Sequence, residues 1–102
     1  MIAAVAERTA DIERLCGRHH VLRLALFGSA ATGQHRSSTS DFDFVVEFQL
    51  LPTGAYADSY FGLLEDLERL LGGPVDLVVG SAIRNPYFRQ SVEQTSALLY
   101  EA

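Results

Sequence analysis

Apolar and polar residues repeat with two different periods along the chain, and these periods predict its helices and strands. Residues 3–18 carry an apolar stripe at helical spacing among charged residues, which predicts a first helix. The nearly continuous apolar run at residues 21–27 is typical of a strand covered on both faces. Residues 41–48 alternate strictly, so a second strand is predicted with one face made of Phe42, Phe44, Val46 and Phe48.

A second helix is predicted at residues 56–71, where apolar residues again repeat at helical spacing. Tyr60 and Phe61 continue its leucine stripe, so both rings are expected to pack in the core. The Gly-Gly-Pro sequence at residues 72–74 ends this helix, because glycine and proline do not continue helical backbone.

The remainder of the chain predicts a third strand, a third helix and a short last strand. The strand covers residues 75–80, and residues 97–102 supply the last one. Asn85 followed by Pro86 is typical of an N-cap and a first helical turn, which predicts a helix to about residue 93. This order of elements predicts an α/β (α+β) fold, a small mixed sheet packed with helices, in a single domain of all 102 residues.

Composition narrows the classes of function. The net charge of −5 argues against non-specific binding of nucleic acid, which relies on basic patches. No apolar stretch approaches the length of a membrane span, and the N-terminal residues carry charges where a signal peptide has its apolar segment. A cytoplasmic protein is therefore expected. Cys16 is the single cysteine, and its helical context predicts a buried residue, not a nucleophile.

Two aspartates stand on one face of the second predicted strand, because residues two apart on a strand point the same way. At about 5 Å and an effective dielectric near 20, ionised Asp41 and Asp43 would repel each other by roughly 3 kcal/mol. A partly buried pair therefore requires a proton, a cation or a basic partner. Divalent ions such as Mg²⁺ prefer carboxylate oxygens and keep open positions for phosphate. Glu47, further along the same face, is expected to be solvated or to contact a partner.

A third carboxylate, Asp76, is the single charge in the third predicted strand. If that strand neighbours the strand of Asp41 and Asp43, the three acids can hold two metal ions roughly 3.5–4 Å apart, a geometry that supports displacement at phosphorus. The acids alone leave an alternative open. In that alternative Asp41 caps the strand start, Asp43 is a solvated face residue and Asp76 caps a turn.

A glycine-rich turn, Gly-Ser-Ala-Ala-Thr-Gly at residues 28–33, connects the first two predicted strands and can open a short helix. Gly28 allows backbone to approach a ligand closely, and backbone N–H groups at such a turn can bind phosphate. The Ser29 hydroxyl can donate to a phosphate oxygen. The turn is not a P-loop, because no Gly-Lys-Ser/Thr sequence follows it.

Residues 26–46 together resemble the signature of the DNA polymerase β-type nucleotidyltransferases: Gly-Ser, a further glycine, then Ser-Asp-x-Asp on a hydrophobic strand. In its small size the chain resembles the minimal nucleotidyltransferases of prokaryotes. Many of these are antitoxins encoded beside a HEPN-domain toxin. The resemblance implies the palm fold of that superfamily. It also implies transfer of AMP from ATP, with Mg²⁺, onto a hydroxyl, and in the toxin-paired relatives the acceptor is a tyrosine of the toxin.

The resemblance also implies roles for particular residues. Gly28 and Ser29 would bind the triphosphate of ATP, Asp41 and Asp43 would be paired ligands of two Mg²⁺ ions, and Asp76 would be the third carboxylate of the catalytic set. A HEPN-domain toxin is the expected partner, and it would supply the acceptor surface. Neither a membrane nor directly bound nucleic acid is expected.

One position departs from the pattern of these relatives. Thr32 stands where they commonly have an arginine in the glycine turn, and Arg36 is a possible substitute for that arginine. Loss of the guanidinium removes a group that can pair with phosphate or with an acid. An antitoxin that neutralises its toxin by contact alone is therefore the alternative prediction. A transferase acting on small molecules is disfavoured, because such relatives usually carry a further domain that binds the acceptor.

Overall fold

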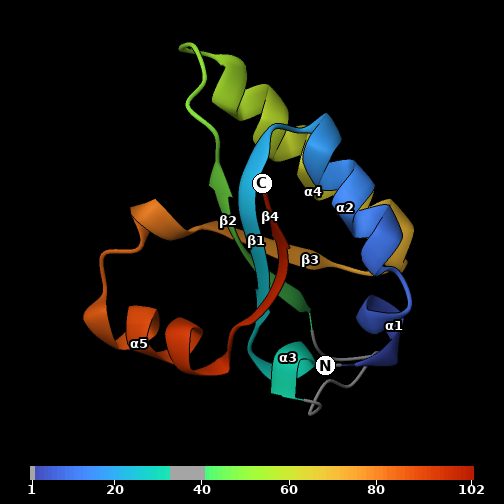
Figure 1. Ribbon diagram of the computed structural model, residues 1–102. Helices are drawn as coiled ribbons and strands as arrows, with labels where there is room; N and C mark the ends of the chain where they lie inside the picture. The colour runs from blue at the N-terminus through green and yellow to red at the C-terminus, as the bar shows by residue number, and fades with distance from the viewer. Residues whose placement is uncertain (1, 33–40) are drawn as a thin grey trace.

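The computed structural model describes residues 2–32 and 41–102, and it builds them around a mixed β-sheet (Figure 1). Within these residues the strands are β1 (Val21–Phe27), β2 (Phe42–Phe48), β3 (Val75–Val79) and β4 (Ala97–Glu101), in the spatial order β3-β2-β1-β4. β1 pairs antiparallel with both β2 and β4, and β2 pairs parallel with β3. The predicted small mixed sheet is therefore confirmed.

Helices lie on both faces of the sheet (Figure 1). α2 (Thr9–Arg18) and α4 (Ala55–Leu71) cover one face, and α5 (Pro86–Thr95) packs against the other. Short helices α1 (Ala3–Ala6), α3 (Ser29–Thr32) and the 3₁₀ turn η1 (Gly80–Ala82) complete the connections. Asn85 caps α5 as predicted, since its side-chain oxygen accepts from the N–H groups of Tyr87 at 2.8 Å and Phe88 at 3.2 Å.

The first predicted helix is divided in the structure. α1 ends at Ala6, and Arg8 has non-helical backbone (φ −120°, ψ 19°) before α2 begins at Thr9. The Arg8 guanidinium donates to the Ala4 carbonyl oxygen at 2.9 Å, and the N–H of Ile2 donates to the Ala30 carbonyl oxygen at 3.1 Å. The first bond closes the turn at the end of α1, and the second joins the residue before α1 to α3. Hydrophobic periodicity does not predict either bond.

The main core lies between the sheet and the pair α2 and α4. Phe44 and Val46 are fully buried and Phe42 is 6% exposed, which confirms the face predicted from the alternation of β2. Cys16 is buried in the same core, and burial raises the pKa of its thiol to about 12, so it stays protonated at neutral pH. A smaller cluster under α5 consists of Phe27, Ile83, Val92, Val45 and Val78.

Phe61 does not join the core, and that prediction is wrong. Its ring is 59% exposed, whereas Tyr60 is half-buried and donates its hydroxyl to the Leu77 carbonyl oxygen at 2.6 Å. The buried stripe of α4 consists of Ser59, Leu63 and Leu67. Phe61 lies two residues from the first two of these, about 200° around a helix with 3.6 residues per turn, so it faces outward.

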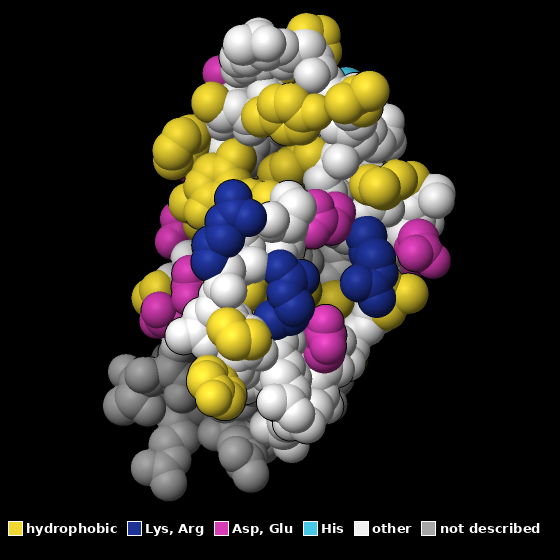
Figure 2. Space-filling model, turned by 90° about the vertical axis from the view of Figure 1, so that its left-hand side faces the viewer, with side chains coloured by type: hydrophobic (Ala, Val, Ile, Leu, Met, Phe, Trp, Pro, Cys, Tyr) yellow, Lys and Arg dark blue, Asp and Glu magenta, His cyan; other side chains and the backbone are white. Residues whose placement is uncertain are grey.

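On the face that includes α5, the basic side chains of the described residues lie beside acidic ones (Figure 2). Figure 2 shows apolar side chains in the upper part of this face, with basic and acidic side chains interspersed below them. Within residues 2–32 and 41–102, no helix is both long enough and apolar enough to cross a membrane.

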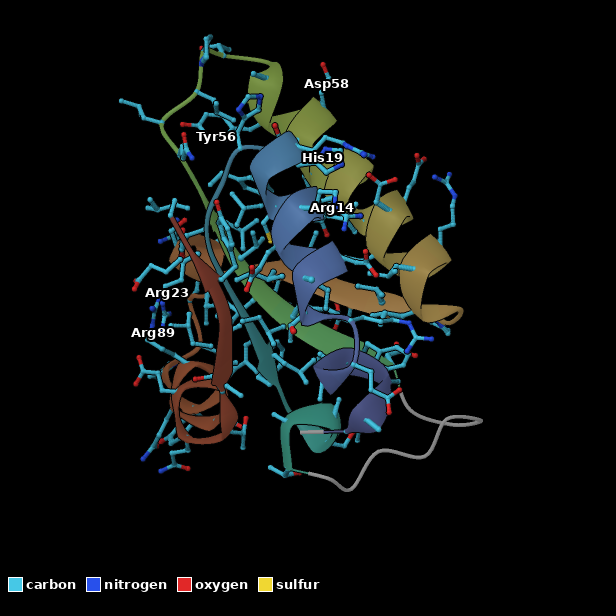
Figure 3. All side chains as sticks on the ribbon, turned by 45° about the vertical axis from the view of Figure 1, so that its right-hand side comes forward. Arg14, His19, Arg23, Tyr56, Asp58 and Arg89 are labelled. Carbon is cyan, nitrogen blue, oxygen red and sulfur yellow. The ribbon has the colours of Figure 1, made fainter. Side chains whose placement is uncertain are left out.

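A hydrogen bond between side chains joins α2 to α4 at the C-terminal end of α2. His19 Nε2 lies 2.6 Å from Asp66 Oδ2, and both side chains are only 15% exposed. Figure 3 labels His19 at the end of α2. Arg18 and Arg69 also contact the Asp66 carboxylate. The hydrogen bond with His19, followed by the nearby positive charges, holds the pKa of Asp66 below its ordinary value of 3.8.

Asp66→Asn should lower stability at pH 7 by about 1 kcal/mol, because the charged hydrogen bond is weakened. A carboxylate with a depressed folded-state pKa stabilises the protein above its unfolded pKa, and this contribution is lost as the pH falls below 3.8 through the folded value. The difference between wild type and variant should therefore shrink in acid. Urea unfolding at pH 7 and pH 3 measures it. A difference that stays constant between these pH values would contradict this role for Asp66.

Candidate functional site

The glycine turn follows β1 and has a backbone shape that favours glycine. Gly28 has φ +71°, in the left-handed region that other residues rarely adopt. Its carbonyl oxygen then accepts the N–H groups of Ala31 and Thr32, both at 3.2 Å, as α3 begins. The turn therefore opens a short helix, as the sequence suggested.

The Asp43 carboxylate lies directly against this turn. β1 and β2 pair Phe27 with Asp43, so the last residue of β1 stands opposite the acid. A Cβ added to Gly28 would lie 2.7 Å from Asp43 Oδ2, closer than real side chains approach. Glycine is thus favoured here for two reasons, its positive φ and the space that the carboxylate occupies.

Asp76 stands beside Asp43 on the neighbouring strand. The parallel pairing of β2 with β3 sets Asp43 opposite Asp76, and paired residues on adjacent strands point to the same face about 4.8 Å apart. Asp41 precedes β2 by one residue, and the N–H of Phe42 donates to the Pro74 carbonyl oxygen at 3.0 Å, so the pairing extends to this end. The backbone therefore brings Asp43 and Asp76 to one face of the β2–β3 pair, and Asp41 lies at the same end, just before β2.

The three carboxylates differ in exposure. Asp43 is half-buried, whereas Asp41 and Asp76 are exposed. Among the described residues, no group of three or more His, Cys, Asp and Glu side chains is gathered closely enough to hold a metal ion. Binding of Mg²⁺ by all three acids therefore requires the exposed side chains to rotate toward Asp43. Their oxygen donors fit a hard divalent ion, and their role as metal ligands stays a prediction.

Thr32 does not supply the chemistry of the arginine that the resemblance predicts at its position. Its hydroxyl lies 3.3 Å from the carbonyl oxygens of both Gly28 and Ser29, so it donates back into the turn. Arg36, predicted as a possible substitute, lies outside the described residues. Hydrogen bonds at Thr32 therefore stabilise the turn and add no positive charge to the site.

One contact to the turn was missed by the sequence analysis. The N–H of Gly28 donates to Thr95 Oγ1 at 3.0 Å. Thr95 is the last residue of α5, which was predicted to end near residue 93. A single threonine in a polar helix gives no periodic signal, so only the tertiary structure identifies it.

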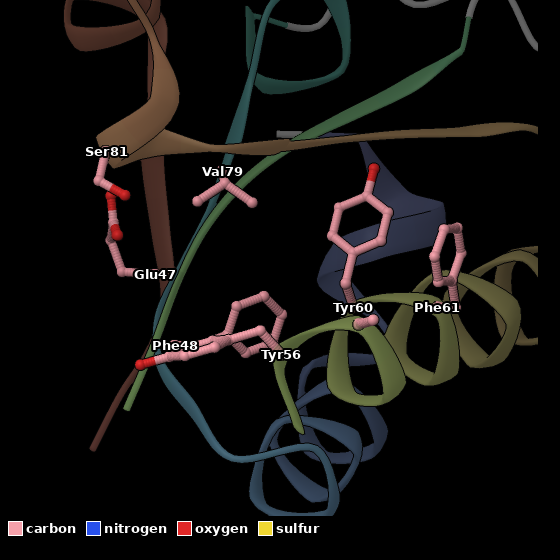
Figure 4. A pocket seen from close by; sticks show the side chains of 8 residues that line it. Glu47, Phe48, Tyr56, Tyr60, Phe61, Val79 and Ser81 are labelled. Atoms are coloured by element: carbon pink, nitrogen blue, oxygen red, sulfur yellow. The ribbon is translucent and has the colours of Figure 1, made fainter. Parts of the chain in front are cut away.

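The large pocket of the described chain lies elsewhere. It has a volume of about 520 Å³, and Figure 4 shows that aromatic side chains form much of its wall; its lining residues are Glu47, Phe48, Tyr56, Ala57, Tyr60, Phe61, Val79 and Ser81. Glu47 is four residues from Asp43 along β2, about 13 Å at 3.3 Å per residue. None of the predicted site residues lines this pocket.

Comparison of the sequence with known proteins gives a consistent set of relatives. A family model described as "Nucleotidyltransferase domain" matches residues 11–99. Two proteins of Methanocaldococcus jannaschii, provisionally named protein adenylyltransferases, are each 39% identical over 77 residues. These alignments cover 76% of this chain and 75% and 74% of the two relatives.

Solved structures share the fold. A provisionally named minimal nucleotidyltransferase has a TM-score of 0.75 at 32% identity, covering 91% of this chain and 90% of that chain. A chain of a toxin–antitoxin complex solved with AMP-PNP has a TM-score of 0.67 at 26% identity, covering 92% and 73%. A chain from a complex of tri-AMPylated Shewanella oneidensis HEPN toxin with MNT antitoxin has a TM-score of 0.64 at 20% identity, covering 95% and 72%. Each similarity spans more than nine tenths of this chain.

Proposed function

Because the chain belongs to the nucleotidyltransferase domain family, we propose that it transfers AMP from ATP onto a hydroxyl group of a partner protein. Family membership confirms the prediction of a nucleotidyltransferase. The single observation that carries the proposal is the meeting of the Asp43 carboxylate with the glycine turn at Gly28. Relatives named as protein adenylyltransferases support AMP as the transferred group and a protein as the acceptor.

The residues of the turn and of the β2–β3 pair have distinct roles in this proposal. Gly28 and Ser29 receive the triphosphate, and Asp41, Asp43 and Asp76 hold divalent ions such as Mg²⁺. Bound ions of this kind lower the pKa of an attacking hydroxyl and neutralise charge on the triphosphate. Asp76 stands opposite Asp43 on the edge strand β3, where an acceptor hydroxyl can approach from solvent.

The proposed acceptor is a tyrosine of a HEPN-domain toxin, so that the protein acts as an antitoxin. Structural relatives occur in toxin–antitoxin complexes, one of them with AMP-PNP and another with an AMPylated HEPN toxin. The chain would then form a hetero-oligomer with its toxin in the cytoplasm.

The decisive experiment supplies ATP labelled at the α-phosphate, together with Mg²⁺ and the HEPN-domain toxin proposed as the partner. We expect label on the HEPN protein, at a tyrosine found by mass spectrometry, and no label after EDTA. ATP labelled at the γ-phosphate separates nucleotidyl transfer from phosphoryl transfer. Absence of label from the α position, or label from the γ position, would overturn the proposal.

A second candidate function is neutralisation of the toxin by contact without transfer. The observation that favours it is Thr32, which returns its hydroxyl to the turn and leaves the site without the arginine of related turns. In this case cells producing the toxin would be protected equally by wild type and by a folded Asp43→Asn protein. Loss of protection with Asp43→Asn would exclude it.

A further inference from the structure

The hydroxyl of Thr95 joins the end of α5 to the glycine turn, across 67 residues of sequence. It accepts the N–H of Gly28 at 3.0 Å and lies 2.9 Å from the Ser91 carbonyl oxygen. A threonine hydroxyl has one proton, and a carbonyl oxygen can only accept. The proton therefore points to Ser91, and the lone pairs of the hydroxyl are directed at the Gly28 N–H.

Gly28 is consequently held from two directions. Its N–H is bound by Thr95, and its Cα faces the Asp43 carboxylate, where a Cβ would come within 2.7 Å of Oδ2. The Phe27–Gly28 peptide cannot rotate without breaking the bond to Thr95. That bond therefore sets how closely the turn approaches Asp43.

Thr95 is itself fixed by the packing of α5 on the sheet. Val92, one turn earlier, is 5% exposed and packs with Phe27 in the smaller cluster. The rings of Phe27 and Phe88 meet edge to face with their centroids 5.9 Å apart. Because the helix is anchored to the same residue that precedes Gly28, its last turn is placed to hold the peptide that follows.

We propose that Thr95 is a positioning residue for nucleotide transfer, which orients the glycine turn for the triphosphate and against Asp43. The inference rests on the proposed function and deepens it. It also changes the role of Gly28, whose N–H is bound within the protein. Gly28 then serves the site through its missing side chain and its positive φ, and the phosphate-binding groups come from Ser29 onward.

The test compares Thr95→Val, which keeps the shape and removes the hydroxyl, with Thr95→Ser, which keeps the hydroxyl. Thr95→Val should raise the KM for ATP about tenfold, because the turn that receives the triphosphate is less firmly held. Its kcat should stay within about threefold of wild type, because no added atom pushes the Asp43 carboxylate away. Thr95→Ser should stay within about twofold. The matched control is Ser96→Ala. The Ser96 hydroxyl lies 3.4 Å from the Glu93 carbonyl oxygen and does not bond to the glycine turn, so its removal should leave KM and kcat unchanged.

A measurement without nucleotide separates this inference from the proposed function. Hydrogen exchange of the Gly28 amide, followed by NMR, should accelerate about tenfold or more in Thr95→Val and stay near wild type in Thr95→Ser and Ser96→Ala. An unchanged Gly28 amide, or equal losses in Thr95→Val and Thr95→Ser, would overturn the positioning role. Absence of AMP transfer by wild type would overturn the proposed function and leave the amide result standing.

Discussion

Asp43→Asn should reduce AMP transfer by about a thousandfold or more and leave the protein folded. The change keeps the size of the side chain and removes the charge of Asp43, the half-buried member of the three acids proposed to hold the metal ions. Loss of a charged metal ligand removes several kcal/mol of transition-state stabilisation, and about 4 kcal/mol corresponds to a thousandfold in rate. The measurement is transfer of labelled AMP from α-labelled ATP to the proposed HEPN partner. Thermal unfolding of each variant checks that it is folded.

The chain offers a matched control for this variant in Glu47→Gln. Glu47 lies on the same face of β2, four residues further along, and lines the large pocket instead of the turn. It should retain transfer within about twofold. Transfer by Asp43→Asn within tenfold of wild type would contradict a role for the Asp43 charge in the reaction. An equal loss in Glu47→Gln would instead show a general effect of charge on this strand face, without a role specific to Asp43.

The sequence predicted those features of the candidate site that follow from the geometry of the strand backbone. A period of two places alternate residues of a strand on one face, so burial of Phe42, Phe44 and Val46 also directs Asp43 to the opposite face. Strand pairing then brings Asp76 beside it. The alternation of residues within one strand was enough to predict the face of Asp43, whereas the pairing of β2 with β3 was only a condition in the sequence analysis and is supplied by the structure.

Other features depend on side-chain positions that no periodicity specifies. The bond from Gly28 to Thr95 joins residues far apart in sequence, and nothing near either residue marks it. The prediction for Phe61 was wrong because the apolar pattern of α4 does not show which residues at the margin of its buried face reach the sheet. The distance between the carboxylates depends on the rotamers of Asp41 and Asp76, which are exposed and therefore weakly constrained by packing.

Gly28→Ala should lower AMP transfer about a hundredfold. Its loss of folding stability should be little larger than that of a glycine-to-alanine change at a positive-φ position remote from the site. Alanine at φ +71° costs about 1–2 kcal/mol from backbone strain. Its Cβ would also collide with Asp43 Oδ2, which is the end of a side chain and can swing away at low cost. The carboxylate then leaves its place beside the turn, and a displacement of about 1 Å at a reacting centre can reduce rates a hundredfold.

Gly72→Ala is the matched control, because Gly72 ends α4 with the same φ of +71° and no described atom within 4 Å of the added Cβ. The two variants share the backbone strain and differ in the contact with Asp43. Urea unfolding should therefore give losses of stability within about 1 kcal/mol of each other, whereas only Gly28→Ala should lose transfer. Equal transfer by the two variants would mean that the Asp43 carboxylate does not act from the position beside Gly28, and the catalytic role of this turn would have to be abandoned.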